Sequence, residues 1–185
     1  MSSRDLLSDA DPVAEVRWFA RGDIDRSLRP RRRGLKRTDW YHLETLSTIR
    51  SIKRRGDRLL EQKWRIGPAS AFDHHAVGGQ TERWIKQRLG KTAPGQDLNG
   101  TWVPIVKRLW RVGDVQVGRL ILEGDDWWTL AVPLPRGELD SCAARLLDRW
   151  ADTLTACGQS SAYPTWLIAR LAETDTALTT SQRAS

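Results

Sequence analysis

Basic side chains recur at alternate positions in several stretches of this 185-residue sequence. In a β-strand, alternate residues point to the same side, so each stretch would present a row of cations on one face. Guanidinium groups form paired hydrogen bonds with phosphate oxygens, and ammonium groups add point charges. The pattern therefore indicates the binding of a phosphate-rich anion. The residues that carry it, with one glutamate at its start, are Glu15, Arg17, Arg50, Arg54, Lys63, Arg65, Lys107 and Arg111.

A row of cations that faces inward is costly unless water, acidic side chains or a bound anion surrounds it. Antiparallel sheets often close into barrels, which removes their edges and directs alternate residues of every strand into the interior. The pattern therefore predicts a basic tunnel that holds a ligand. The alternative is that some strands have the opposite orientation, so that these residues form an ordinary charged outer face.

Alternating polar and apolar residues predict about seven or eight strands in hairpin order. The clearest hairpin spans 47–67, where two strand-like runs flank Gly56-Asp57. Segment 81–90 fits a helix or a strand, whereas 67–80 and 90–100 have the composition of loops. Segment 23–38 is expected to be a loop or a short helix that ends in the basic run 29–37. The other strands are expected at 14–22, 39–46, 101–112, 115–124 and 126–135.

Apolar residues take up helical spacing after Gly137 and keep it until about Gly158, and a second helix is expected from Pro164 to Ala172. The predicted fold class is α+β, with a largely antiparallel, closed or nearly closed β-barrel or tunnel and C-terminal helices. We expect a single domain over 13–172 with its helical part at 138–172. A disordered N-terminus (1–12) and a flexible tail (173–185) would flank it.

The charge balance favours anionic partners. Lys and Arg total 30 against 23 Asp and Glu, a formal net charge of +7, which suits nucleotides, polyphosphate or nucleic acid. No apolar run approaches the roughly 18 residues of a membrane span, and the N-terminus has no apolar signal core. We therefore expect a cytoplasmic protein without a membrane partner, in which Cys142 and Cys157 are reduced. Most of the ten Trp residues are expected in the core and its rim.

Three other motifs are weaker. Gly90-Lys91-Thr92 lacks the earlier glycine of a phosphate-binding loop, because Ile85 stands in that place. Asp73-His74-His75 indicates a metal site or a surface loop, and the loop is favoured because no paired Cys or Glu spacing accompanies it. No G-x-S-x-G motif or Cys–His pairing indicates a nucleophile.

The order of the stretches resembles the CYTH superfamily, the triphosphate-tunnel fold of class IV adenylate cyclases and thiamine triphosphatases. EVRWFARG, ERW, DDWWTL and AYPTWL are most similar to a functionally uncharacterised bacterial branch of CYTH-like proteins. The resemblance covers residues 13–170. It is carried by AEVRWFARG, TIRSIKRR, LLEQKWRIG, IVKRLWRV and AYPTWL.

The resemblance implies an enzyme that acts on a phosphoanhydride bond, with Mg²⁺ or Mn²⁺ as its cofactor. Glu15 would be the metal ligand and would act in catalysis together with Lys63. Arg17, Arg50, Arg54, Arg65, Lys107 and Arg111 would bind phosphate oxygens.

The chain also departs from the family pattern. The family's E-x-E-x-K appears as Glu15-x-Arg17-x-Phe19, its K-x-R as Lys107-x-Leu109, and 129–134 lacks the paired glutamates of active members. Because Mg²⁺ and Mn²⁺ need carboxylates, these departures weaken the expectation of a metal cofactor.

The leading hypothesis is a tunnel that binds, and as an enzyme would hydrolyse or otherwise transform, a nucleotide or an organic triphosphate. A second hypothesis is a non-enzymatic single-stranded nucleic-acid binder, for which the net charge of +7, the basic run 29–37 and the abundant Trp residues are the reasons. A third is a catalytically degenerate scaffold protein, for which the missing glutamates are the reason.

Overall fold

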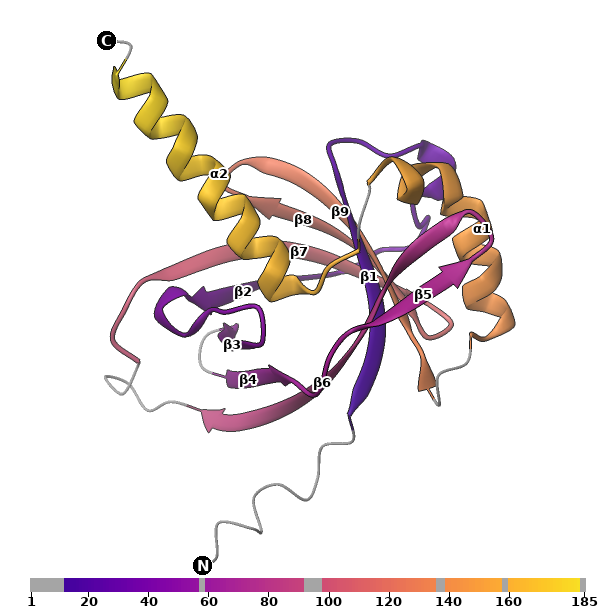
Figure 1. Ribbon diagram of the computed structural model, residues 1–185, viewed down its shortest axis with the longest axis horizontal. Helices are drawn as coiled ribbons and strands as arrows, with labels where there is room; N and C mark the ends of the chain where they lie inside the picture. Colours follow the sequence, from indigo (N-terminus) through magenta and orange to yellow (C-terminus); the bar gives the residue numbers. More distant parts are fainter. Residues whose placement is uncertain (1–11, 57–58, 92–97, 136–138, 158–159, 184–185) are drawn as a thin grey trace, which may run out of the picture.

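Nine strands followed by two helices form the described part of the chain, residues 12–56, 59–91, 98–135, 139–157 and 160–183 (Figure 1). The computed structural model also contains two single 3-10 turns, Arg26–Leu28 and Leu43–Thr45. The helices are α1 (Ser141–Ala156) and α2 (Tyr163–Arg183). The strands are β1 (Val13–Arg21), β2 (Leu35–His42), β3 (Arg50–Arg55), β4 (Leu59–Arg65), β5 (Ser70–His74), β6 (Val77–Lys91), β7 (Trp102–Val112), β8 (Val115–Leu122) and β9 (Asp125–Pro133).

Eight of these strands close into an antiparallel barrel. They lie in the order β1-β9-β8-β7-β2-β3-β4-β6, and β6 returns to β1 through the pairs Val13–Trp84 and Glu15–Glu82. The remaining strand, β5, extends the sheet beyond the barrel as a hairpin with β6. Closure pairs both sides of each barrel strand, which removes the edges of the sheet. The predicted fold class, a closed antiparallel barrel with C-terminal helices, is confirmed.

The segment 67–80 was predicted to be a loop, and this prediction is wrong. It contains β5 and the start of β6, where Gly78 and Gly79 mark a close approach of the backbone to β1. A Cβ atom on Gly79 would lie 2.9 Å from Val16 Cγ2 and 3.1 Å from Trp18 Cζ2, and the Trp18 indole donates a hydrogen bond to the Gly78 carbonyl at 3.1 Å. Glycine within a strand commonly marks such an approach.

Several other boundaries differ from the sequence-based ones. β2 begins at Leu35, inside the expected loop, and the ambiguous segment 81–90 is part of strand β6. The 47–67 hairpin is confirmed by the β3–β4 pairing, although residues 57–58 of its turn lie outside the described residues. Helix α2 continues to Arg183, so the expected end at Ala172 was too early. The expected disorder of 1–12 falls almost entirely outside the described residues.

Helix α1 covers the outer side of the barrel. It packs with the β5–β6 hairpin over the outward-facing side chains of β1, β8 and β9, and Leu147, Trp150 and Leu154 of α1 are almost completely buried there. The helix begins where Asp140 accepts hydrogen bonds from the backbone amides of Cys142 and Ala143, a common way to satisfy the first turn. Within the described residues, no helix combines the length and apolarity needed to cross a membrane.

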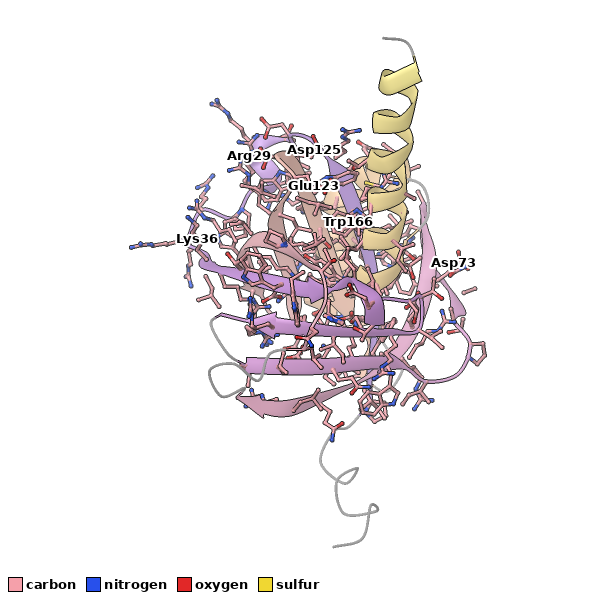
Figure 2. The ribbon with its side chains drawn as sticks, turned by 90° about the vertical axis from the view of Figure 1, so that its left-hand side faces the viewer. Arg29, Lys36, Asp73, Glu123, Asp125 and Trp166 are labelled. Atoms are coloured by element: carbon pink, nitrogen blue, oxygen red, sulfur yellow. The ribbon has the colours of Figure 1, made fainter. Side chains whose placement is uncertain are left out.

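Helix α2 closes one end of the barrel with its first two turns (Figure 1). Tyr163, Trp166 and Leu167 insert among luminal side chains of five strands and form a second apolar cluster. The Trp166 ring stacks on Phe19, with centroids 4.4 Å apart and planes 5° from parallel, and it lies where the helix meets the strands (Figure 2). The lumen is therefore divided into an apolar half filled by α2 and a polar half left open to the other end.

Candidate functional site

The polar half of the lumen forms a chamber of about 280 Å³, which we call the luminal chamber. Strand pleating directs alternate residues of each barrel strand into it. Among the described residues, its walls carry eight basic side chains, and three carboxylates contact these: Glu15, Asp39 and Glu61. Five positive charges are therefore not matched by acids. The basic residues are Arg17, Arg37, Lys53, Arg55, Lys63, Lys86, Lys107 and Arg111.

Glu15 on β1 is held by two cations, Arg17 on the same strand and Lys63 on β4. The Lys63 ammonium donates a hydrogen bond to Glu15 Oε1 at 3.0 Å, and an Arg17 guanidinium nitrogen lies 3.5 Å from Oε2. Arg17 also donates to Thr129 Oγ1 at 3.3 Å. The Lys63 ammonium lies 4.2 Å from the centroid of the Trp84 ring, a favourable cation–π contact. Both oxygens of Glu15 are thus occupied by protein cations.

Asp39 is the centre of a larger ion cluster on β2, β3 and β7. Its side chain is fully buried, and four cations lie within 4 Å of its oxygens. Their nitrogens lie 2.9 Å (Lys107), 3.2 Å (Arg37), 3.5 Å (Lys53) and 3.8 Å (Arg55) away. Because one carboxylate faces four cations, the cluster keeps a strong positive potential.

Glu61 on β4 shares two of the cations that surround Asp39. The Lys53 ammonium lies 3.0 Å from Glu61 Oε1, and the Arg55 guanidinium lies 3.2 Å from Oε2. The antiparallel registers place Lys53 between Tyr41 on β2 and Glu61 on β4. The two acidic groups are therefore linked through β3 into one network.

The protonation equilibria reflect this charge excess. Burial alone would raise the pKa of Glu15, but the charges of Lys63 and Arg17 outweigh it and hold the pKa well below its usual range. Burial would likewise raise the pKa of Asp39, but the charges of Lys107 and Lys53 hold it well below its usual range. Burial lowers the pKa of Lys63 to about 8, although Glu15 opposes the shift. Burial likewise lowers the pKa of Lys107 well below its ordinary value, against the opposing charge of Asp39.

Two tyrosines fix Lys107 at the closed end of the chamber. Its ammonium donates to the Tyr41 hydroxyl at 3.0 Å and lies 3.9 Å from the centroid of the Tyr163 ring, which belongs to the first turn of α2. The Arg17 guanidinium lies over the same Tyr163 ring, 5.1 Å from its centroid. The helix that closes the barrel therefore also forms the floor of the chamber.

Two buried polar groups on this floor make no hydrogen bond within the described part of the chain. They are the Tyr163 hydroxyl and Nε of Arg17. Buried polar groups are almost always paired with protein, water or a ligand. A hydrogen-bond acceptor in the chamber would satisfy both of them.

The chamber opens into a wider cavity of about 680 Å³, the mouth, which is lined by residues of β1, β6, β7, β8 and β9. Glu15, Arg17, Lys86, Arg111 and Gln116 line both spaces, so the two are continuous. Lys86 and Arg111 lie at this junction, where part of each side chain reaches solvent. The mouth adds apolar groups, which come mainly from Val13, Ala131, Pro133 and Leu134.

The luminal carboxylates do not suit Mg²⁺ or Mn²⁺. These ions bind several carboxylate or other oxygen ligands, yet Glu15, Asp39 and Glu61 are each held by at least two cations at 2.9–3.5 Å. The unmatched positive charge would also repel a divalent cation. Glu15 is therefore better described as an anchor for Lys63 and Arg17 than as the expected metal ligand.

The structure brings five of the eight predicted residues together in the chamber: Glu15, Arg17, Lys63, Lys107 and Arg111. The expected luminal position of Arg50 and Arg54 is wrong. Both pair across the sheet with residues of the outer face, Arg50 with Trp64 and Arg54 with Trp40, because the luminal residues of β3 are the odd-numbered ones.

Arg65 has the luminal orientation on β4, but it lies beyond the chamber lining. It is close to Glu82 instead. Burial raises the pKa of Glu82, and the charge of Arg65 opposes that rise. Arg65 therefore lies outside the residues that line the chamber, and its contact with a ligand stays a prediction.

Sequence reasoning missed Arg37, Asp39, Lys53 and Arg55, which form most of the ion cluster. It also missed Lys86, which lines the chamber. The alternation of Glu82, Trp84 and Lys86 was visible and could have indicated Lys86 once β6 was recognised as a strand. For β3 no such signal existed, because basic residues occur on both of its faces.

No protein-family model matches the chain, and no curated protein matches it.

Proposed function

We propose that the luminal chamber binds the phosphate groups of a small phosphorylated molecule, such as a nucleotide or an organic triphosphate. The observation that carries the proposal is the excess of five positive charges around a small, closed-ended cavity. An excess of positive charge in a partly desolvated space raises the free energy of the empty protein, and an anion would relieve that cost. The resemblance of the sequence to CYTH proteins also supports phosphate binding in the barrel.

The shape of the cavity supports an elongated ligand. The chamber is lined by Arg and Lys, which suit phosphate oxygens, whereas Val13, Ala131 and Pro133 give the mouth an apolar part. Ligand sites commonly combine an apolar wall with a few polar anchors. We therefore place the phosphates in the chamber and the organic group in the mouth.

The site supports binding better than hydrolysis. A general base should have a pKa near the working pH, but the pKa of Glu15 is held well below its usual range by Lys63 and Arg17. Lys63, with a pKa of about 8, is better suited to proton transfer than Glu15 is. Its main contribution to the site is nevertheless the positive charge that would bind an anion. Hydrolysis of a phosphoanhydride bond would therefore need a base other than Glu15.

Isothermal titration calorimetry with tripolyphosphate, pyrophosphate and orthophosphate tests the proposal. We expect one tripolyphosphate per chain and an affinity that rises with the number of phosphates, because each added group can contact further cations. Excess Mg²⁺ should weaken binding, since it neutralises the ligand. The absence of saturable binding at millimolar tripolyphosphate would contradict the proposal. A parallel assay for released orthophosphate distinguishes a binding protein from a hydrolase.

The affinity for tripolyphosphate should fall above pH 8. An anion binds the protonated form of Lys63, whose pKa in the free protein is about 8, so at higher pH binding requires the uptake of a proton. The dissociation constant should rise by about tenfold between pH 7 and pH 9 from this one group. In Lys63→Arg, which stays charged throughout this range, calorimetry should show a clearly smaller rise. An equal rise in both proteins would exclude Lys63 as the titrating group.

A second candidate function is the binding of single-stranded nucleic acid on the outer face. Arg31, Arg32 and Arg33 are exposed, and the Arg54 guanidinium lies over the rings of Trp40 and Trp102, 5.6 Å and 5.3 Å from their centroids. Aromatic rings beside basic residues can bind single strands. Replacing Arg31, Arg32 and Arg33 together by glutamine should abolish RNA binding if this face is used and should leave tripolyphosphate binding unchanged.

A further inference from the structure

The turn between β5 and β6 lies against helix α1, on the outside of the barrel (Figure 1). Two histidines at this turn contact Asp148 of the helix. His74 ends β5, His75 follows it in the turn, and Asp148 lies on α1. One potential ligand atom from each of the three residues lies within 4.8 Å of the others. This cluster is separate from the luminal chamber and plays no part in the function proposed above.

The backbone of the turn accounts for the unusual position of His75. Consecutive residues of a strand point to opposite faces, so neighbouring histidines would normally diverge. His75 instead has a φ of 51°, a left-handed conformation that is uncommon for residues other than glycine. The two imidazole rings consequently lie together, with centroids 4.3 Å apart.

The spacing of the three groups fits one metal ion. His74 Nε2 lies 2.9 Å from Asp148 Oδ1, and His75 Nε2 lies 3.9 Å from the same oxygen. Zn²⁺ binds nitrogen and oxygen at about 2.0–2.2 Å in a tetrahedron, which places ligand atoms roughly 3.4 Å apart. The two observed separations lie on either side of that value, so small side-chain rotations would complete the geometry.

We propose that His74, His75 and Asp148 form a binding site for a divalent transition metal such as Zn²⁺. Two imidazoles and one carboxylate suit Zn²⁺, Ni²⁺ or Cu²⁺, whereas Mg²⁺ and Ca²⁺ prefer oxygen ligands. A hydrogen bond between His74 and Asp148 would by itself explain the position of those two residues. It would not explain why the strained turn directs His75 to the same carboxylate.

The site would join the β5–β6 hairpin to α1. His74 is mostly buried, with 15% of its side chain exposed, whereas His75 is 76% and Asp148 53% exposed. The exposed side leaves the fourth coordination position open to water or to a ligand from solution. Metal that binds only the folded chain would raise the melting temperature.

Titration of the full chain with Zn²⁺ alone tests the site, with cobalt absorption spectra as a second readout. We expect one ion per chain with a dissociation constant on the order of 10 µM or lower. His75→Asn, which tolerates the positive φ, and Asp148→Asn should each weaken binding about tenfold or more. Asp152→Asn, an exposed acid one turn further along α1, and Asp73→Asn are matched controls that should bind as the wild type does.

Cysteine thiols are the main competing Zn²⁺ ligands, so the Cys142→Ser/Cys157→Ser double variant should also bind normally. Three results would overturn the proposal. The first is the absence of saturable binding at 100 µM Zn²⁺ by the folded wild-type chain. The second is an affinity for Zn²⁺ that neither His75→Asn nor Asp148→Asn changes. The third is the loss of Zn²⁺ binding in the cysteine double variant.

Discussion

Replacing Asp39 by asparagine is expected to lower the free energy of unfolding by about 3–5 kcal/mol, the usual cost of breaking a buried ion pair by removing one partner. Asp39 is fully buried and lies within 4 Å of Lys107, Arg37, Lys53 and Arg55. Asparagine keeps the shape of the side chain but removes its charge. Glu61 would still contact Lys53 and Arg55, but Lys107 and Arg37 would have no close acidic partner among the described residues.

For a domain of this size the melting temperature should fall by roughly 6–20 °C. Asp125→Asn is the matched control, because Asp125 also forms a close ion pair, 2.7 Å from Arg21, but on the exposed surface, where it should contribute less than about 1 kcal/mol. Tripolyphosphate should raise the melting temperature of Asp39→Asn more than that of the wild type, since the anion replaces the missing charge. Equal, small losses in both variants would contradict the account of the ion cluster.

Replacing Lys86 by glutamine should weaken tripolyphosphate binding about tenfold to a hundredfold, as expected for one charged hydrogen bond. Lys86 lines both the chamber and its mouth. Burial and the charges of Arg17 and Lys53 lower its pKa, although Glu15 opposes the shift. The empty protein should therefore be at least as stable without this lysine, and only ligand binding should suffer.

Lys36→Gln provides the control for this substitution. Lys36 lies on β2, and its exposed side chain extends away from the barrel (Figure 2), so it changes the net charge equally without touching the chamber. Calorimetry at two salt concentrations should show a large loss for Lys86→Gln and almost none for Lys36→Gln. Similar losses in both variants would mean that the chain binds anions through its overall charge.

The barrel was predictable from sequence because its strands carry a clear alternation. On β7, Lys107 and Arg111 alternate with residues of the outer face, and the structure confirms their luminal orientation. On β3 the sequence RSIKRR carries basic residues on both faces. The prediction chose Arg50 and Arg54 and missed Lys53 and Arg55, because a shift of one residue exchanges the two faces of a strand.

Contacts between segments far apart in the sequence account for the parts of the site that could not be predicted. Asp39 meets cations from residues 37, 53, 55 and 107 only because β2 lies between β3 and β7 in the barrel. Trp166 was predicted to lie in the second helix and Tyr163 directly before it, but nothing in the sequence indicates that this helix closes the lumen. The His74–Asp148 contact likewise joins residues far apart in the chain.

A crystal structure of the chain with bound tripolyphosphate tests the central claim most directly. The account predicts phosphorus density inside the barrel, with phosphate oxygens near the Lys63, Lys86 and Arg111 side chains and the Tyr163 hydroxyl. Density on the outer face near Arg31, Arg32 and Arg33, or an empty chamber at saturating ligand, would contradict it.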